Sequence, residues 1–124
     1  SWTRISDERY KKDIQNNTDL GLAFINDLRP VTFKFKLMSE IDSSLPDYDE
    51  TDSLGVPIPQ DRMYGLIAQE VKEVLDDHNI TDFGGHTTTE NEVELQGISQ
   101  EMFIHPLIKA VQELSAKVEA LENN

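Results

Sequence analysis

The chain has 124 residues, and its 24 acidic side chains outnumber 11 basic ones, which gives a formal net charge of -13 at pH 7. Such a charge repels nucleic acids and anionic membranes, so we expect neither as a partner. The sequence has no cysteine, which excludes disulfides and thiol chemistry, and no apolar run approaches the roughly 20 residues of a membrane span.

The length predicts one domain with room for a modest core. The mean hydropathy of -0.51 is low for a globule that folds alone. We therefore expect part of the apolar surface to be shared between subunits. The absence of a methionine before Ser1 suggests a fragment of a longer protein.

The N-terminal segment combines an extended lead-in with a charged stretch. Residues 1–5 alternate apolar and polar side chains, which is typical of extended backbone. In Ser6–Asp13 a serine precedes two acids, and bases follow a turn later, as at a capped helix start. A helix cap is therefore the default interpretation of Ser6.

A helix and a strand are predicted next. Asn17 or Thr18 can cap a helix that ends at Arg29-Pro30, because the residue before a proline disfavours helical backbone. Its apolar positions are Leu20, Ala23, Phe24 and Leu28. The period then becomes two over residues 31–37, which predicts a strand with one buried face. That face would hold Val31, Phe33, Phe35 and Leu37.

Residues 40–61 are an acidic segment with seven Asp or Glu side chains and no Lys or Arg. A loop of about 20 residues is unusual inside a compact domain and tends to be functional or mobile. The run Asp47–Asp52 resembles a calcium loop, but the EF-hand pattern needs Asp or Asn and then Gly where this chain has Thr51 and Asp52. We expect a solvated arm that projects from the sheet.

The next predicted elements are shorter. Residues 62–67 form a second strand or a strand-to-helix turn, and a helix over 68–75 ends at 76–79. The apolar face of this helix would hold Ile67, Val71, Val74 and Leu75. Residues 80–92 are weakly patterned and predict a loop, whereas 93–98 alternate briefly and predict a third short strand.

A heptad stripe runs along the last predicted helix, residues 104–122. Its members step by three and four in turn, and they are Ile104, Leu107, Val111, Leu114, Val118 and Leu121. Such a stripe can pack on the domain's own core, but its narrowness favours a self-associating coiled coil. β-Branched residues at the a position of the heptad and leucine at the d position would indicate a coiled coil of two helices. Pro106 requires the helix to begin nearby or to bend.

These elements predict an α+β fold. Short helices accompany a small antiparallel sheet, the acidic arm lies between two strands, and a long helix closes the chain. His78, His86 and His105 share no metal-ligand spacing, and Gly84-Gly85 lacks the context of a phosphate loop. We therefore expect no metal and no cofactor.

Ser6 and Lys11 are the one candidate catalytic pair. A serine needs a base to remove its proton, and a lysine serves only when burial or nearby positive charge favours its neutral form. Arg9 and Lys12 are positive neighbours. A five-residue spacing does not face across a regular helix, so Ser6 would have to lie before the helix, in extended backbone. The residues alone leave the dyad and the helix cap both open.

Four segments, in the same order, resemble the C-terminal intramolecular chaperone domain of phage tail spikes and tail fibres, the self-cleaving endosialidase-type serine peptidases. They cover nearly the whole chain, and they are SDERYKKDI at Ser6–Ile14, LRPVTF at Leu28–Phe33, YGLIAQEV at Tyr64–Val71 and PLIKAVQEL at Pro106–Leu114. The acidic arm and residues 83–91 resemble no shared pattern. The shortness and acidity of the chain are similar to those of neck-appendage tail spikes of short-tailed Bacillus phages.

The resemblance implies a cut at the Ile5–Ser6 bond. Ser6 would attack the preceding carbonyl with Lys11 as general base, in a single turnover on its own chain. Asp7 would help to position the site, and we infer that Arg9 orients the turn or stabilises the oxyanion. Residues 1–5 would then be the end of an upstream stalk, and residues 6–124 the chaperone domain.

The resemblance also implies a homotrimer. This overrides the preference for a coiled coil of two helices and assigns the heptad stripe to a trimer interface. The domain would assist folding of the upstream stalk, with the arm of residues 40–61 reaching up to hold it, and would then release itself. It would fold in the bacterial host cytoplasm as part of a tail precursor and leave the mature particle after cleavage.

Two other functions remain open. The chain could be a trimerisation or receptor-binding tip that never cleaves, in which Ser6 is only a cap. It could also be the same domain in a eukaryotic membrane-bound transcription factor, which the acidic arm and the lack of a nearby membrane span disfavour.

Overall fold

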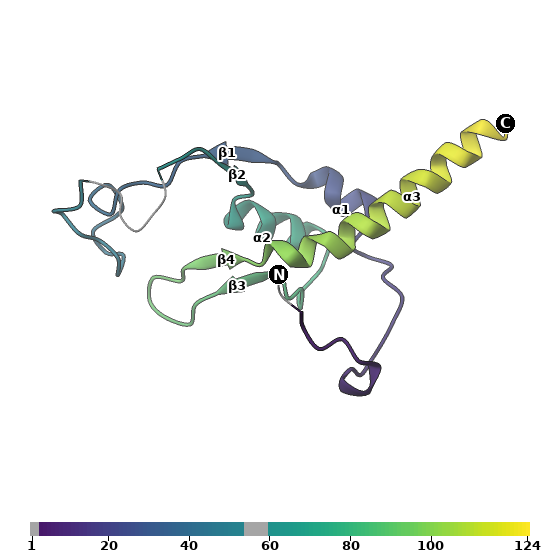
Figure 1. The fold of residues 1–124 in the computed structure, drawn as a ribbon, viewed down its shortest axis with the longest axis horizontal. Helices are drawn as coiled ribbons and strands as arrows, with labels where there is room; N and C mark the ends of the chain where they lie inside the picture. The colour runs from purple at the N-terminus through teal and green to yellow at the C-terminus, as the bar shows by residue number, and fades with distance from the viewer. Residues whose placement is uncertain (1–2, 54–59) are drawn as a thin grey trace.

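The computed structural model describes residues 3–53 and 60–124, so parts of the predicted stalk end (1–2) and arm (54–59) lie outside the described residues. The fold is α+β, as expected, and its elements spread along one long axis (Figure 1). In chain order they are η1 (Glu8–Tyr10), α1 (Leu22–Asp27), β1 (Val31–Phe33), β2 (Met63–Gly65), α2 (Ala68–Asp77), β3 (His86–Thr88), β4 (Gln96–Ile98), η2 (Gln100–Phe103) and α3 (Ile104–Glu122).

The core is small and lies where α1, α2 and η2 meet. Its buried side chains are Phe24, Val71, Leu75 and Phe103. The ring of Phe24 is fully buried. It stacks on Phe103 at 6.2 Å between centroids and meets Phe83 edge-on at 6.1 Å. Aromatic side chains bury more apolar area than any others, so this cluster dominates the stability of the fold.

Helix α2 confirms the prediction from its apolar spacing. The helix covers Ala68–Asp77, two residues longer than predicted, and buries Val71 and Leu75 against the core. These two residues are four apart and therefore share one face of the helix. The predicted strand before the helix is also present, as β2.

Helix α1 is shorter than predicted, and neither Asn17 nor Thr18 caps it. The Asn17 side chain instead holds a turn, in which Oδ1 accepts from the backbone N–H of Leu20 at 3.0 Å and the amide donates to the Leu20 carbonyl at 2.7 Å. The helix begins only after Gly21. An asparagine side chain that bonds its own turn competes with helical backbone, which explains the late start.

The sheet prediction was wrong in two respects. The strands form two separate antiparallel pairs, β1–β2 and β3–β4. Strand β3 lies at 86–88, inside the segment predicted to be a loop, where Thr87 pairs with Gly97. In addition, β1 ends at Phe33, and Phe35 is 43% exposed although alternation placed it on the buried face. Strand β3 forms in spite of its weak sequence pattern, because its β-branched threonines favour strands and because β4 pairs with it.

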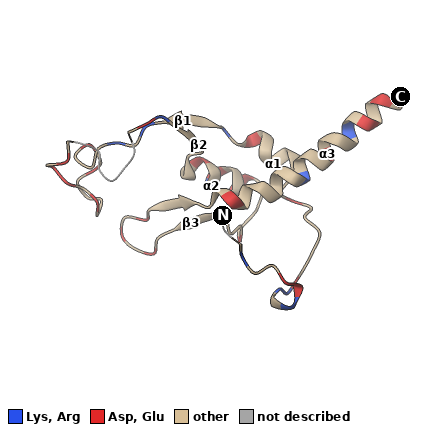
Figure 2. Ribbon diagram, viewed as in Figure 1, with Lys and Arg blue, Asp and Glu red and all other residues tan. Residues whose placement is uncertain are grey.

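The acidic arm projects from the β1–β2 pair, away from the helices (Figure 1). Its described part folds back on itself, because the Met38 N–H donates to the Asp52 carboxylate at 2.8 Å and the Asp49 N–H donates to the Met38 carbonyl at 3.1 Å. Asp and Glu recur along it (Figure 2). Among the described residues, no cluster of three or more potential ligands could hold a metal ion.

Helix α3 has two different faces. Pro106 lies in its first turn, where a missing N–H is tolerated, and is buried with Ala110 against α1. The Glu113 carboxylate accepts from the Leu22 N–H at 3.1 Å, at the start of α1. The bounds Ile104–Glu122 match the prediction, and the first half of the helix does pack on its own core. No helix of the described residues is long and apolar enough to cross a membrane.

Candidate functional site

Ser6 and Lys11 are in direct contact. The Lys11 ammonium donates a hydrogen bond to the Ser6 hydroxyl at 2.7 Å between Nζ and Oγ. The intervening residues form the single turn η1, and Lys11 follows it with extended backbone angles (φ -116°, ψ 147°). The five-residue spacing of Ser6 and Lys11 is therefore compatible with a pair. A short 3-10 turn brings together two side chains that an α-helix would separate.

Asp7, and not Ser6, caps the turn. Its carboxylate accepts from the Arg9 backbone N–H at 2.9 Å and from the Arg9 guanidinium at 2.7 and 3.0 Å. The hydrogen bonds from the Arg9 side chain and backbone lower the pKa of the Asp7 carboxyl, and the same contact raises the pKa of Arg9. The default interpretation of Ser6 as a helix cap is therefore wrong, and the Ser6 hydroxyl is left to Lys11.

The Asp7–Arg9 pair also changes the expected electrostatics of Lys11. The sequence suggested that Arg9 and Lys12 would both add positive charge beside Lys11. The Arg9 charge is balanced by Asp7 through two side-chain hydrogen bonds. Arg9 therefore orients the turn in this structure and adds little net field at Lys11.

The pair lies on a segment that the domain does not enclose. Every side chain of residues 3–15, here named the N-terminal strap, is exposed. Within the described chain, η1 packs against no other helix or strand. Figure 1 shows the strap as a purple loop that hangs clear of α2. The Ile5–Ser6 bond, at which the family resemblance implies a cut, thus lies between two exposed residues.

The predicted interface residues on α3 are brought onto one exposed face. The heptad stripe is between 46% and 73% exposed, with Leu107 and Val118 at the lower limit and Leu121 at the upper. From Ser115 onward every residue of α3 is exposed, and the helix projects alone (Figure 1). A continuous stripe of exposed apolar residues is typical of an interaction surface.

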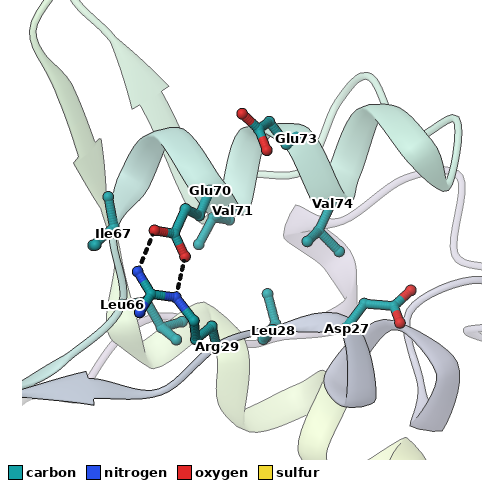
Figure 3. A pocket seen from close by; sticks show the side chains of 9 residues that line it. All are labelled: Asp27, Leu28, Arg29, Leu66, Ile67, Glu70, Val71, Glu73 and Val74. Atoms are coloured by element: carbon teal, nitrogen blue, oxygen red, sulfur yellow. Dashed lines mark hydrogen bonds and ion pairs between the residues drawn. The ribbon is translucent and has the colours of Figure 1, made fainter.

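A pocket of about 500 Å³ lies between α1 and α2. Figure 3 shows the forked ion pair of Arg29 with Glu70 at one end and Asp27 at the other. The guanidinium hydrogen bonds lower the pKa of Glu70, and the same bonds raise the pKa of Arg29. The sequence did not predict this pocket. Both ionic residues stand in segments that resemble the family, but local patterns do not show that residues 41 apart form a pair.

Of the three histidines, only His78 contacts one of these sites, through the pocket residue Asp27. His78 pairs with Asp27 at 2.8 Å between Nε2 and Oδ2, and His86 contacts Gln96. His105 is an exposed residue at the start of α3. The three side chains therefore remain separate, as their spacing predicted.

The comparison with protein families agrees with the family resemblance of the sequence. A family model described as chaperone of endosialidase, whose name classes it as a peptidase, matches residues 6–80. The match begins at Ser6 and includes the strap and the α1–α2 pocket. No curated protein matches the chain.

Proposed function

The chain belongs to the chaperone of endosialidase family, and on that premise we propose that it is an intramolecular chaperone of a phage tail spike or tail fibre. It trimerises, assists folding of an upstream stalk, and releases itself by autoproteolysis at the Ile5–Ser6 bond. The observation that carries the cleavage is the 2.7 Å contact of Lys11 Nζ with Ser6 Oγ.

The reaction is an intramolecular acyl transfer. Ser6 Oγ attacks the carbonyl carbon of Ile5 while its proton passes to Nζ of neutral Lys11. The peptide C–N bond breaks, and Lys11 returns the proton to the departing nitrogen. Water then hydrolyses the ester, which leaves a carboxylate on Ile5 and restores the Ser6 hydroxyl. Lys11 must lose a proton before these steps, because in the structure its ammonium donates the hydrogen bond to Ser6 Oγ.

Trimerisation is supported by the free half of α3. An isolated helix shorter than about 12–15 residues is marginal in water, and every residue of α3 beyond Leu114 is exposed. Three such helices that pair along the heptad stripe would bury those apolar side chains. They would also bring three stalks together before slow, non-local pairing begins.

The remaining roles follow from this assembly. The acidic arm extends from the sheet and is proposed to hold the folding stalk. Folding takes place in the host cytoplasm, and cleavage frees the domain from the virion tail. Once the domain has gone, an unfolded stalk has lost its assembly aid, so the tail becomes kinetically stable.

Expression of the chain with its upstream stalk tests the cleavage. Mass spectrometry of denatured wild type should show a fragment that begins at Ser6, and Ser6→Ala should leave the full-length chain. Lys11→Ala should lower the cleavage rate by about 10²–10⁴-fold, as loss of a general base does. Ser43→Ala and Lys34→Ala, at exposed positions, are matched controls that should cleave normally.

Two readings of the same samples separate the alternatives. Intact wild type that remains trimeric by light scattering would contradict the peptidase and favour a non-cleaving tip. Normal cleavage in Lys11→Ala would contradict only the dyad. A stable monomer would contradict the trimer.

A further inference from the structure

The N-terminal strap carries apolar side chains that its own chain does not cover. Ile5, Tyr10 and Ile14 are 72%, 75% and 69% exposed. They lie within ten residues of one another, on a segment whose one turn packs against no other element of the described chain. Such a segment loses much conformational freedom when it is held in one place, so it needs a surface to be held against.

One side of the strap is distinct from the side that reacts. Lys11 has extended backbone angles, and neighbours in extended backbone point to opposite sides. Lys11 turns toward Ser6, so Lys12 leaves the chain on the other side. Lys12 has no hydrogen-bond or ion-pair partner among the described residues. Tyr10 is the last residue of η1 and its side chain is exposed. The strap therefore presents an exposed aromatic ring close in sequence to an unpaired cation.

The α1–α2 pocket has the complementary surface. Leu28, Leu66 and Val74 contribute its apolar floor. Its charged residues are three carboxylates and a single guanidinium, which is already held by Glu70. Glu73 lines the rim and, like Lys12, has no partner in the described part of the chain. A cavity of about 500 Å³ lies in the range of small-molecule pockets and therefore has room for an aromatic side chain.

We propose that the strap of one copy docks in the α1–α2 pocket of a second copy, with Tyr10 on the apolar floor and Lys12 opposite Glu73. This rests on the proposed function, since it makes the reacting segment part of a contact between subunits. The docked strap is held still, and its free side presents Ser6 and Lys11 to the Ile5 carbonyl. Orientation of this kind accelerates an intramolecular reaction.

A second copy is the occupant because the strap of the same chain is directed away from the pocket. In Figure 1 the strap hangs below the domain, whereas α1, α2 and the start of β1 lie above it. The chain as a whole has a net charge of -13, whereas the strap, with four basic and three acidic side chains, has a net charge of +1. The unpaired cation of Lys12 favours contact with the acidic rim of a neighbour.

A photo-crosslink at the rim identifies the occupant. A benzophenone is attached to the thiol introduced by Glu73→Cys, which is unique because the chain has no cysteine. Isotopically heavy and light copies, each joined to its stalk, are expressed separately, unfolded, mixed and refolded together. Heavy-to-light adducts that contain strap peptides are expected. Adducts within one copy, or adducts only with the stalk, would overturn the proposal. The same probe at Glu119→Cys, on the free end of α3, should give no strap adduct.

Cleavage rates provide the second test. Tyr10→Ala should slow cleavage about tenfold, as loss of a buried aromatic anchor does. Lys12→Glu and Glu73→Lys should each slow it about two- to fivefold, and the double variant should recover most of the loss. Additive effects in the double variant would overturn the pairing. Trimers that cleave normally in all these variants would overturn the strap contact while leaving the proposed function intact.

Discussion

The N-terminal strap and the α1–α2–α3 core differ in almost every physical respect. The core holds Phe24, Val71, Leu75 and Phe103 at no more than 7% exposure, whereas every residue of the strap is exposed. The core is held by apolar packing between distant elements, and the strap by hydrogen bonds over two to five residues. The stability of the domain and its chemistry therefore reside in different places.

This separation suits the proposed single self-cleavage. A bond that breaks next to a packed core would disturb the core, but the Ile5–Ser6 bond lies on a segment that contributes no apolar burial. We therefore expect cleavage to leave the fold intact. The following substitutions test the comparison, in order of decreasing effect on stability.

The largest effect is expected for Phe24→Ala. The ring of Phe24 is fully buried and contacts two other aromatic rings, so its removal should lower the free energy of unfolding by about 3–5 kcal/mol. Urea unfolding followed by circular dichroism measures the change. Tyr10→Ala, an aromatic residue on the strap, is the control and should change stability by less than about 0.5 kcal/mol in the unassembled chain. A similar loss in both variants would contradict the separation.

An intermediate effect is expected at the contact between α1 and α3. A Cβ atom added at Gly21 would lie 1.8 Å from Oε1 of Glu113, which is too close for two non-bonded atoms. The Glu113 carboxylate would have to move away and would lose the hydrogen bond from the Leu22 N–H at the start of α1. Gly21→Ala and Glu113→Ala should each lower the free energy of unfolding by about 1–2 kcal/mol, as loss of a helix cap does.

Because both substitutions remove the same hydrogen bond, the double variant should be about as stable as either single one. Thermal unfolding of the four proteins measures this coupling. If the two losses of stability are fully additive, the substitutions do not act through the hydrogen bond between the Leu22 N–H and the Glu113 carboxylate.

The smallest effect is expected for the Arg29–Glu70 pair and depends on pH. Hydrogen bonds from Arg29 lower the folded-state pKa of Glu70 below its ordinary value of 4.5. The pair's contribution is therefore complete above that value and is lost as the pH falls through the folded pKa. The destabilisation caused by Glu70→Gln should shrink between pH 6 and pH 3, as measured by chemical unfolding. Glu92→Gln, on an exposed loop, should show no comparable change.

The elements with strong local periodicity were predictable. Helix α3 has the predicted bounds, and α2 differs by two residues at one end, because apolar residues three and four apart define a helical face without reference to the fold. The start of α1 and strand β3 were not predictable in this way. Asn17 bonds its own turn, and β3 exists because β4 pairs with it.

The sequence by itself determined that Ser6 and Lys11 are a candidate pair and that α3 carries an apolar stripe, because both depend on residues near one another in the chain. The structure decided that Asp7 and not Ser6 is the cap, a local choice between two neighbouring residues that can both cap a turn. It also brought Glu113 to α1 and Arg29 to Glu70, 91 and 41 residues apart. Contacts of that range depend on how the helices pack, which local patterns do not encode.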